Sequence, residues 1–414
     1  MVVPPRGLAD MGGLTTMTGP GIPENRDAIT ADWMRRALVA GGFPDTPPID
    51  DVVVSDIGAG AGVLAETLRC RLVRHGGAEA VPATVIVKLP TTDPKILRIS
   101  RMQSFYKREY DYYRHLAPDA PVRSPRLLYG AWEDRGHRFV LVLEDLAGMR
   151  PGDHFAGATP GQARCAIRAL ARLHGRYWND LGRPPLSDRF DTTGWKIRPL
   201  LQILYLAFLV PTLERFGSFL SAEMRRTAEA YGPRVADHVA GIASSAPLTF
   251  IHGDYRLDNL FFGAGPEDIA LIDWQVSGLG CGLYDVAFFL GASVTVEVRR
   301  EIERDALQEY TDIVVETGGK KAQEFTFDEC WRLYRSNMLG RLLVSIVVCG
   351  ALDLKDQRIK ALAESGLHRT LTAIEDLRAA EFLPPRAPFL SGANLFSTLS
   401  SGAYRVYRAV RGTR

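Results

Sequence analysis

An acid–amide–acid pattern in the second half of the chain most constrains what it can fold into. Asp254, in IHGDYRLDNLFF, is followed five residues later by Asn259, and Asp273 lies fourteen residues after that in the apolar run LIDWQ. One carboxylate can orient and deprotonate an attacking hydroxyl, while an amide oxygen and a second carboxylate hold Mg²⁺ against nucleotide phosphates. The spacing therefore predicts a loop and a strand that gather these side chains for phosphoryl transfer.

The same stretch resembles a known family. HGDYRLDNLFF, LIDWQ and GLYDVAFFL are together similar to the aminoglycoside phosphotransferase/choline kinase superfamily, and the DWQ and YDVAFFLGAS segments most resemble its ecdysteroid kinase-like (CHK kinase-like) branch. The Asp-to-Asn spacing is also that of the protein-kinase catalytic loop, H-R-D-x-x-x-x-N. The resemblance is firm over about residues 250–312 and extends in outline over most of the chain.

The resemblance implies a role for each polar residue of the motif. It makes Asp254 the catalytic base, and Asn259 and Asp273 the metal ligands. Arg256, two residues after the base, would neutralise charge on the transferring phosphoryl group. Asp285, in GLYDVAFF, would brace the catalytic loop.

Up to about residue 145 the pattern of apolar and polar residues predicts a small β-sheet with one main helix. Four short runs are β-branched or alternate between apolar and polar residues, as strands do: 52–57, 67–73, 84–90 and 137–146. Apolar residues at helical spacing predict one helix over 96–117, and Thr30 can cap another over 31–42.

A strand lysine and a helix glutamate complete the expected chemistry. A kinase holds the α- and β-phosphates with such a lysine, and the glutamate orients it. Lys88 lies on the run TVIVKLP and Glu109 lies on the following helix, so we take Glu109 as the partner of Lys88. Asp111 and Glu133 are rival acids for this position.

The acidic segment LEDL ends the last of the predicted strands. In the superfamily that this chain resembles, such a segment is the hinge, and its backbone groups meet the edge of the adenine. The resemblance therefore implies nucleotide contacts through the backbone of Glu144, Asp145 and Leu146.

The stretch DIGAGAG places three glycines at alternate positions after a β-branched run. Read alone, it resembles the first motif of S-adenosylmethionine-dependent methyltransferases. That motif requires a helix directly after the glycines and a strand ending in an acid about 20 residues on, whereas TLRCRLV alternates with period two. We therefore expect Gly58, Gly60 and Gly62 to let backbone amides approach the phosphates of ATP, although the third glycine comes one residue earlier than in G-x-G-x-x-G.

After residue 150 the pattern is mostly helical. Two short apolar runs, 247–254 and 268–275, interrupt the helices and predict a hairpin. The expected fold class is α+β, a protein-kinase-like fold with a small N-terminal antiparallel sheet lobe and a larger, mainly helical C-terminal lobe. The expected divisions are a disordered leader, an ATP-binding lobe, a catalytic and substrate lobe and a tail: 1–25, 26–143, 144–383 and 384–414.

Composition favours neither nucleic acid nor a membrane as a partner. The 50 basic and 48 acidic side chains give a formal charge of +2, so no overall charge attracts nucleic acid. The apolar runs 203–210 and 342–354 are shorter than the ~18–20 residues of a membrane span. Five scattered cysteines without a C-x-x-C pair, and no secretory signal pattern, predict reduced thiols in a cytoplasmic protein.

Together these features predict an ATP- and Mg²⁺-dependent enzyme that moves the γ-phosphate to a hydroxyl of a small molecule. A catalytically inactive, nucleotide-binding pseudokinase and an S-adenosylmethionine-dependent methyltransferase are the alternatives. The acceptor region, 181–216, is rich in apolar residues and offers only Asp188, Asp191 and Glu214 to meet a polycation. This favours an apolar hydroxylated acceptor, such as a sterol-like or polyketide-like molecule, over an aminoglycoside. The sequence leaves open the oligomeric state and the role of the arginine-rich tail.

Overall fold

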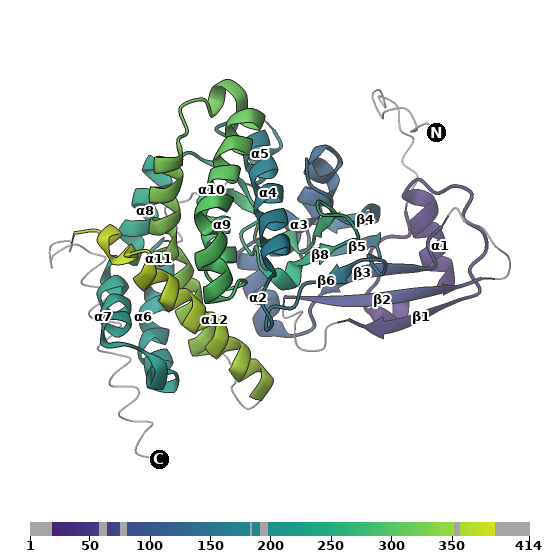
Figure 1. Cartoon of the computed structure of the whole chain (residues 1–414). Coiled ribbons are helices and arrows are strands. Elements are labelled where there is room, and N and C mark those ends of the chain that lie inside the picture. The colour runs from purple at the N-terminus through teal and green to yellow at the C-terminus, as the bar shows by residue number, and fades with distance from the viewer. Residues whose placement is uncertain are drawn as a thin grey trace, which may run out of the picture. The chain divides into compact units, whose positions relative to one another are not determined.

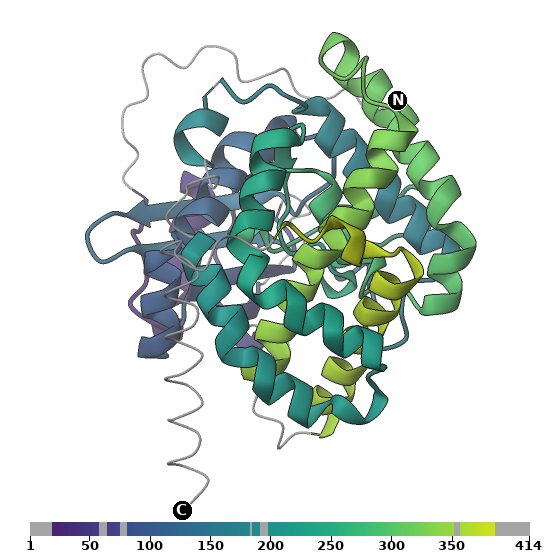
Figure 2. The same cartoon turned by 90° about the vertical axis from the view of Figure 1, so that its left-hand side faces the viewer.

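The computed structural model describes residues 19–57, 64–74, 81–182, 184–190, 198–351 and 357–385. They fold as two compact units (Figures 1 and 2). The N-terminal unit comprises the described residues up to Arg114 together with Pro125–Leu146, and the C-terminal unit comprises His115–Ser124 and those from Ala147 onward. Each unit carries some of the residues predicted to take part in catalysis or nucleotide binding.

An antiparallel sheet is the framework of the N-terminal unit. Its strands are β1 (Asp51–Asp56), β2 (Ala65–Val73), β3 (Thr84–Pro90), β4 (Leu127–Glu133) and β5 (Arg138–Glu144). Their order across the sheet is β1-β2-β3-β5-β4, and every neighbouring pair is antiparallel. Four strands confirm the predicted runs. The sequence does not predict β4, because LLYGAWE has no clean alternation of apolar and polar residues.

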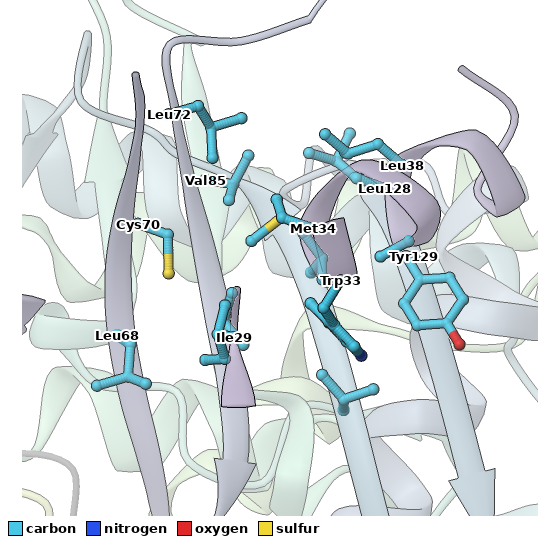
Figure 3. Close-up of a cluster of buried hydrophobic side chains, with 14 of the residues drawn as sticks. Ile29, Trp33, Met34, Leu38, Leu68, Cys70, Leu72, Val85, Leu128 and Tyr129 are labelled. Carbon is cyan, nitrogen blue, oxygen red and sulfur yellow. The ribbon is translucent and has the colours of Figure 1, made fainter. Parts of the chain in front are cut away.

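Helix α1 (Ala31–Ala40) packs on one face of this sheet (Figure 3). Thr30 caps it as predicted, since its Oγ1 accepts from the N–H of Trp33 at 3.2 Å. The buried cluster joins apolar residues of the helix to those of β2, β3 and β4: Trp33, Met34, Leu38, Leu68, Cys70, Leu72, Val85 and Leu128. The alternate apolar positions of β2 thus belong to one buried face, as their period of two predicts.

The helix predicted over 96–117 is divided in two. Helix α2 (Pro94–Met102) begins after an Asp93 cap. Ser104 then takes a left-handed conformation at φ 55°, which cannot continue a right-handed helix, and the chain restarts as α3 (Phe105–Asp111). The short α3 therefore carries Glu109 on an element of its own.

Helices dominate the C-terminal unit. They are α4 (Pro160–Arg176), α5 (Leu186–Arg189), α6 (Arg198–Arg215), α7 (Ala222–Tyr231), α8 (Val235–Ser245), α9 (Leu283–Leu290), α10 (Val296–Gly318), α11 (Phe327–Ala351) and α12 (Gln357–Asp376). Helix α10 packs along α4, and α11 packs against α6, α9 and α12 (Figure 2). Helix α11 is therefore a central, largely buried helix of this unit. Within the described ranges, every helix is too short or too polar to cross a membrane.

Two small sheets in the C-terminal unit hold the segments around the acid–amide–acid pattern. Their strands are β6 (Arg150–Pro151), β7 (Thr249–Ile251), β8 (Leu260–Phe262), β9 (Ile269–Leu271) and β10 (Gly278–Gly280). β7 pairs with β10, while β8 pairs with β9 and with β6. The hairpin predicted from 247–254 and 268–275 is therefore wrong. Both runs contain strands, but apolarity identifies a strand and not its partner.

Candidate active site

The candidate catalytic loop, residues 252–259, connects β7 to β8 in the C-terminal unit. Gly253 takes φ +83°, and a Cβ there would lie 2.4 Å from the carbonyl oxygen of Val276. Glycine is therefore required by the backbone conformation and by the close approach of a neighbouring segment. The side chain of Asp254, which follows this turn, is 27% exposed, so a substrate can reach it.

Asp285 holds the backbone of this turn from the first turn of α9. Its Oδ2 accepts from the N–H of His252 at 2.6 Å, and its Oδ1 accepts from the N–H of Gly253 at 2.9 Å. The side chain of Asp285 is fully buried, and charge-assisted hydrogen bonds are about twice as strong as neutral ones. The structure thus makes Asp285 a brace of the catalytic loop.

Two histidines extend this network. His174 on α4 lies 3.3 Å from Asp285 through Nε2 and 2.9 Å from the hydroxyl of Tyr310 through Nδ1. His252 donates from Nε2 to a backbone carbonyl after β9 at 2.9 Å and accepts at Nδ1 from the N–H of Asp254 at 3.3 Å. These partners select the Nε2–H tautomer of His252. Sequence reasoning misses Tyr310, because nothing in the helical spacing of its segment signals a contact with His174.

Asn259 closes the loop onto the acid. Its Nδ2 donates to the backbone carbonyl of Asp254 at 2.9 Å and to the carboxylate Oδ2 at 3.2 Å. Since both partners are acceptors, the amide nitrogen faces Asp254 and the amide oxygen points away from it. This is the orientation that a metal ligand at Asn259 requires.

Asp273 follows β9 and takes a left-handed φ of 67°. Ile272, just before it, donates its N–H to the carbonyl of Asn259 at 3.0 Å. The ladder between β8 and β9 therefore extends beyond the strands and sets Asp273 beside the end of the catalytic loop. Its charge also acts on Arg256. The three residues of the acid–amide–acid pattern thus share one locality of the C-terminal unit.

The donor atoms at this locality fit Mg²⁺. An amide oxygen and a carboxylate are the hard oxygen ligands that Mg²⁺ takes, with waters and substrate phosphates completing its octahedron. No group of three or more His, Cys, Asp or Glu side chains in the described part of the chain could hold a metal ion by itself. Asn259 and Asp273 could supply one oxygen ligand each, and the remaining positions would fall to waters and substrate phosphates.

Arg256 lies beside the candidate base. Its Nε is 3.5 Å from Asp254 Oδ2, and its NH1 is 3.8 Å from Asp258 Oδ2. The charge of Asp254 is the main cause that raises the pKa of Arg256 above its usual value, while burial acts against it. Among the described residues, its buried Nε has no hydrogen-bond partner. The guanidinium is therefore held beside the carboxylate of Asp254, with its Nε on the side of that acid.

In the N-terminal unit, the structure brings the predicted lysine and glutamate together. Lys88 Nζ lies 2.6 Å from Glu109 Oε1. Both side chains are buried, that of Glu109 completely. The rival acids Asp111 and Glu133 form ion pairs with other cations. The contact places Lys88 where β3 and α3 can hold it in one orientation.

The predicted hinge segment follows β5. The N–H of Glu144 donates to the carbonyl of Arg126 at 2.9 Å and is thus already engaged. Asp145 forms a bidentate ion pair with Arg69 of β2, at 2.8 and 3.0 Å. The N–H of Leu146 makes no backbone hydrogen bond to any residue in the described ranges. The N–H of Glu144 is thus engaged within the N-terminal unit, whereas that of Leu146 is open to a ligand.

Some predicted residues lie outside the described part of the chain. They are Gly58, Gly60 and Gly62 of DIGAGAG, Asp191 of the acceptor region, and the tail after residue 385. Their roles stay predictions.

Comparisons with known proteins identify the family and the fold. Residues 75–322 match the model of the phosphotransferase enzyme family, APH. Among solved structures, choline kinase from Cryptosporidium parvum Iowa II has a TM-score of 0.51 at 12% identity, covering 80% of this chain and 92% of that one. Plasmodium vivax ethanolamine kinase has a TM-score of 0.49 at 12% identity, covering 86% and 91%. No curated protein sequence matches the chain. The likeness to the choline kinase concerns the fold and confirms the predicted kinase-like α+β architecture.

Proposed function

The chain belongs to the phosphotransferase enzyme family, and on this premise we propose that it transfers the γ-phosphate of ATP, with Mg²⁺, to a hydroxyl of a small molecule. One observation carries the proposal. Asp254 is accessible, yet it is fixed beside Asn259 by a loop whose backbone is bound by the buried Asp285. A general base must be held in this way, within hydrogen-bond reach of the proton that it removes.

In the proposed reaction, the hydroxyl oxygen of the acceptor attacks the γ-phosphorus. The bond between that phosphorus and the bridging oxygen to the β-phosphate breaks, ADP leaves, and the hydroxyl proton passes to Asp254. Arg256 stabilises the charge on the transferring group, because its guanidinium lies beside Asp254 and its side chain is partly exposed. Asn259 and Asp273 would hold Mg²⁺, which neutralises phosphate charge when bound.

We propose that the N-terminal unit binds the rest of the nucleotide. Lys88, oriented by Glu109, would meet the α- and β-phosphates, and the amides of the DIGAGAG glycines would approach the phosphates from the chain between β1 and β2. The backbone of Glu144, Asp145 and Leu146 would meet the adenine. The contact of 2.6 Å between Lys88 and Glu109 supports this assignment.

We expect ATP with Mg²⁺ to raise the melting temperature of the protein, and S-adenosylmethionine to leave it unchanged. A ligand at about 100 times its Kd stabilises a protein by ~2.7 kcal/mol, which scanning fluorimetry detects. Asp273→Asn should lose the Mg²⁺-dependent part of the shift. Asp268→Asn, which changes a half-buried acid between β8 and β9, should keep it. A shift with S-adenosylmethionine alone would contradict the proposal.

We expect Lys88→Met to lower both the stability and the affinity for ATP. The fully buried Glu109 loses an ammonium at 2.6 Å, and breaking a buried ion pair costs about 3–5 kcal/mol. The double variant Lys88→Met/Glu109→Leu should recover part of the stability in urea denaturation but none of the affinity in titration calorimetry.

Lys95→Met, which removes an exposed lysine of α2, is the control for the Lys88 variants and should change neither quantity. Recovery of ATP affinity in the double variant would show that Lys88 acts only through the stability of the sheet.

The two alternative functions differ in their support. A pseudokinase would share every contact described above and would differ only in lacking turnover. A methyltransferase site on DIGAGAG needs strands and helices that alternate in a parallel sheet, whereas the sheet that flanks this stretch is antiparallel throughout. The antiparallel sheet therefore weighs against a methyltransferase.

We also propose a cytoplasmic enzyme of the ecdysteroid kinase-like branch. All five cysteines are buried thiols, as suits a reducing compartment. The branch rests on the YDVAFFLGAS segment that forms α9 and the turn after it.

A further inference from the structure

Arg341 is a buried cation that forms no ion pair with any residue that the structure describes. It lies on α11 and is 9% exposed. Its Nε is buried without a hydrogen-bond partner, and within the described ranges no hydrogen bond or ion pair engages the rest of its guanidinium. Burial lowers the pKa of Arg341 below its usual value, because the charged form is poorly solvated there. Buried charges in proteins are normally paired. The guanidinium of Arg341 is therefore a candidate site for an anionic ligand.

Arg341 is nevertheless held firmly in place. Its guanidinium lies over the ring of Phe288 at 4.3 Å. Its Cγ packs against the backbone at Gly291, where an added Cβ would lie 3.4 Å away. Phe288 is one turn after Asp285 on α9, the helix that braces the catalytic loop, and the charge of Asp254 acts on Arg341. Arg341 is therefore a fixed cation packed against α9, the helix whose Asp285 braces the catalytic loop.

Two further arginines share this neighbourhood. The pKa of His154 is lowered to about 3, first by burial and then by the charges of Arg341, Arg256 and Arg369. Arg369 donates to three backbone carbonyls, which satisfy its N–H groups without neutralising its charge. Three arginines therefore lie near His154, where Asp153 and Asp258 are the neighbouring acids.

We propose that the acceptor carries an anionic oxygen group, a carboxylate or a phosphate, which Arg341 binds while the acceptor hydroxyl meets Asp254. The proposal rests on the proposed function. A planar guanidinium binds such groups through two parallel N–H···O bonds, and these would give Arg341 the partners that it lacks. Helix α6, which is apolar and packs against α11, suits an acceptor whose remaining part is apolar. The substrate class is thus a hydroxylated, amphiphilic acid.

The test compares matched acceptors with radiolabelled ATP. Hydroxy acids of increasing chain length are set against their primary amides and against hydroxyalkyl phosphates of the same length. In the wild type, we expect kcat/KM for the acid or the phosphate to exceed that for the amide by about 10–100-fold, the range of a charge-assisted hydrogen bond. The anion with the larger ratio is the one that the site takes.

Substitutions then assign the preference to Arg341. Arg341→Gln should bring the ratio of acid to amide close to one, and Arg341→Lys should retain part of it. Arg332→Gln removes an exposed arginine of the same helix, which pairs with Glu329 at 2.7 Å, and it should keep the wild-type ratio. A ratio that Arg341→Gln leaves unchanged overturns the inference, and is the result expected if Arg341 acts on the transferring phosphoryl group instead.

Equal rates for acids, phosphates and amides in the wild type also overturn the inference, and they leave the proposed function standing. Transfer to uncharged alcohols but to no acid or phosphate would likewise overturn the inference and leave the proposed function standing. Absence of transfer to every compound instead removes the proposed function, and the inference with it.

A measurement of stability gives a readout that does not depend on turnover. Arg341→Met should raise the melting temperature, because a flexible thioether side chain fills most of the space without an unneutralised buried charge. A lowered melting temperature would show that Arg341 serves the fold, and it would contradict the inference.

Discussion

Asp254→Asn is expected to lower the rate of phosphoryl transfer by ~10²–10⁴, the usual contribution of a general base, while ATP still raises the melting temperature. The asparagine keeps the size of the side chain and an oxygen for the Nδ2 of Asn259, which also bonds the backbone carbonyl at this position. It cannot take the proton of the acceptor hydroxyl. Initial rates of ADP release and scanning fluorimetry on the same sample measure the two properties.

The control for this variant is Asp258→Asn in the same loop. Asp258 also lies near Arg256, at 3.8 Å, but within the described ranges its side chain makes no hydrogen bond to the amide of Asn259. Its variant should turn over at nearly the wild-type rate. Equal rates for Asp254→Asn and the wild type would exclude Asp254 as the base. If the wild type binds ATP and shows no turnover, the protein is the pseudokinase.

Asp285→Asn is expected to destabilise the C-terminal unit by about 2–4 kcal/mol, because a buried carboxylate that accepts several hydrogen bonds is replaced by a neutral group. An amide can accept at one oxygen only, so its NH₂ group would face one of the N–H groups of His252 and Gly253. Urea denaturation should give a lower midpoint with the same slope. The rate of phosphoryl transfer should also fall where the variant is still folded, since the loop loses its fixed backbone.

Asp305→Asn provides the comparison for Asp285→Asn. Asp305 is an exposed acid of α10, 3.5 Å from Arg164, and substitutions at such surface positions usually change stability by less than about 0.5 kcal/mol. A similar midpoint for both variants would mean that the two backbone hydrogen bonds of Asp285 contribute little.

The elements that sequence reasoning predicts are those determined by local pattern. The Thr30 cap of α1 is one example. Its hydroxyl accepts from an amide only three residues later, so the contact depends on neighbouring residues alone. Leu68, Cys70 and Leu72 alternate on β2 because one face of the sheet is buried. The close approach of Asp254 and Asn259 likewise follows from a spacing of five residues within one loop.

What the sequence could not predict depends on distant partners or on single backbone angles. β7 pairs with β10 rather than with β9, although all three are short and apolar. The helix over 96–117 breaks at Ser104, whose left-handed conformation has no signature in the residues around it.

Burial is the other property hidden from the sequence. Arg341 lies in an apolar helix, and the sequence does not say whether an arginine there is exposed or buried. The packing of α9 against α11 shows that its side chain is buried. His174 and Tyr310 are separated by 136 residues, and their hydrogen bond forms only because α10 packs along α4.

During synthesis on the ribosome, the residues of the catalytic loop are made before the residues that hold the loop in place. Asp254 and Asn259 are synthesised before Asp285, and Tyr310, which binds the histidine that contacts this carboxylate, is synthesised later still. Contacts between distant residues also form late in folding, because a long stretch of chain must first close. A nascent chain that ends before α9 therefore contains the catalytic side chains but lacks the carboxylate that holds their loop, and it should not hydrolyse nucleotide.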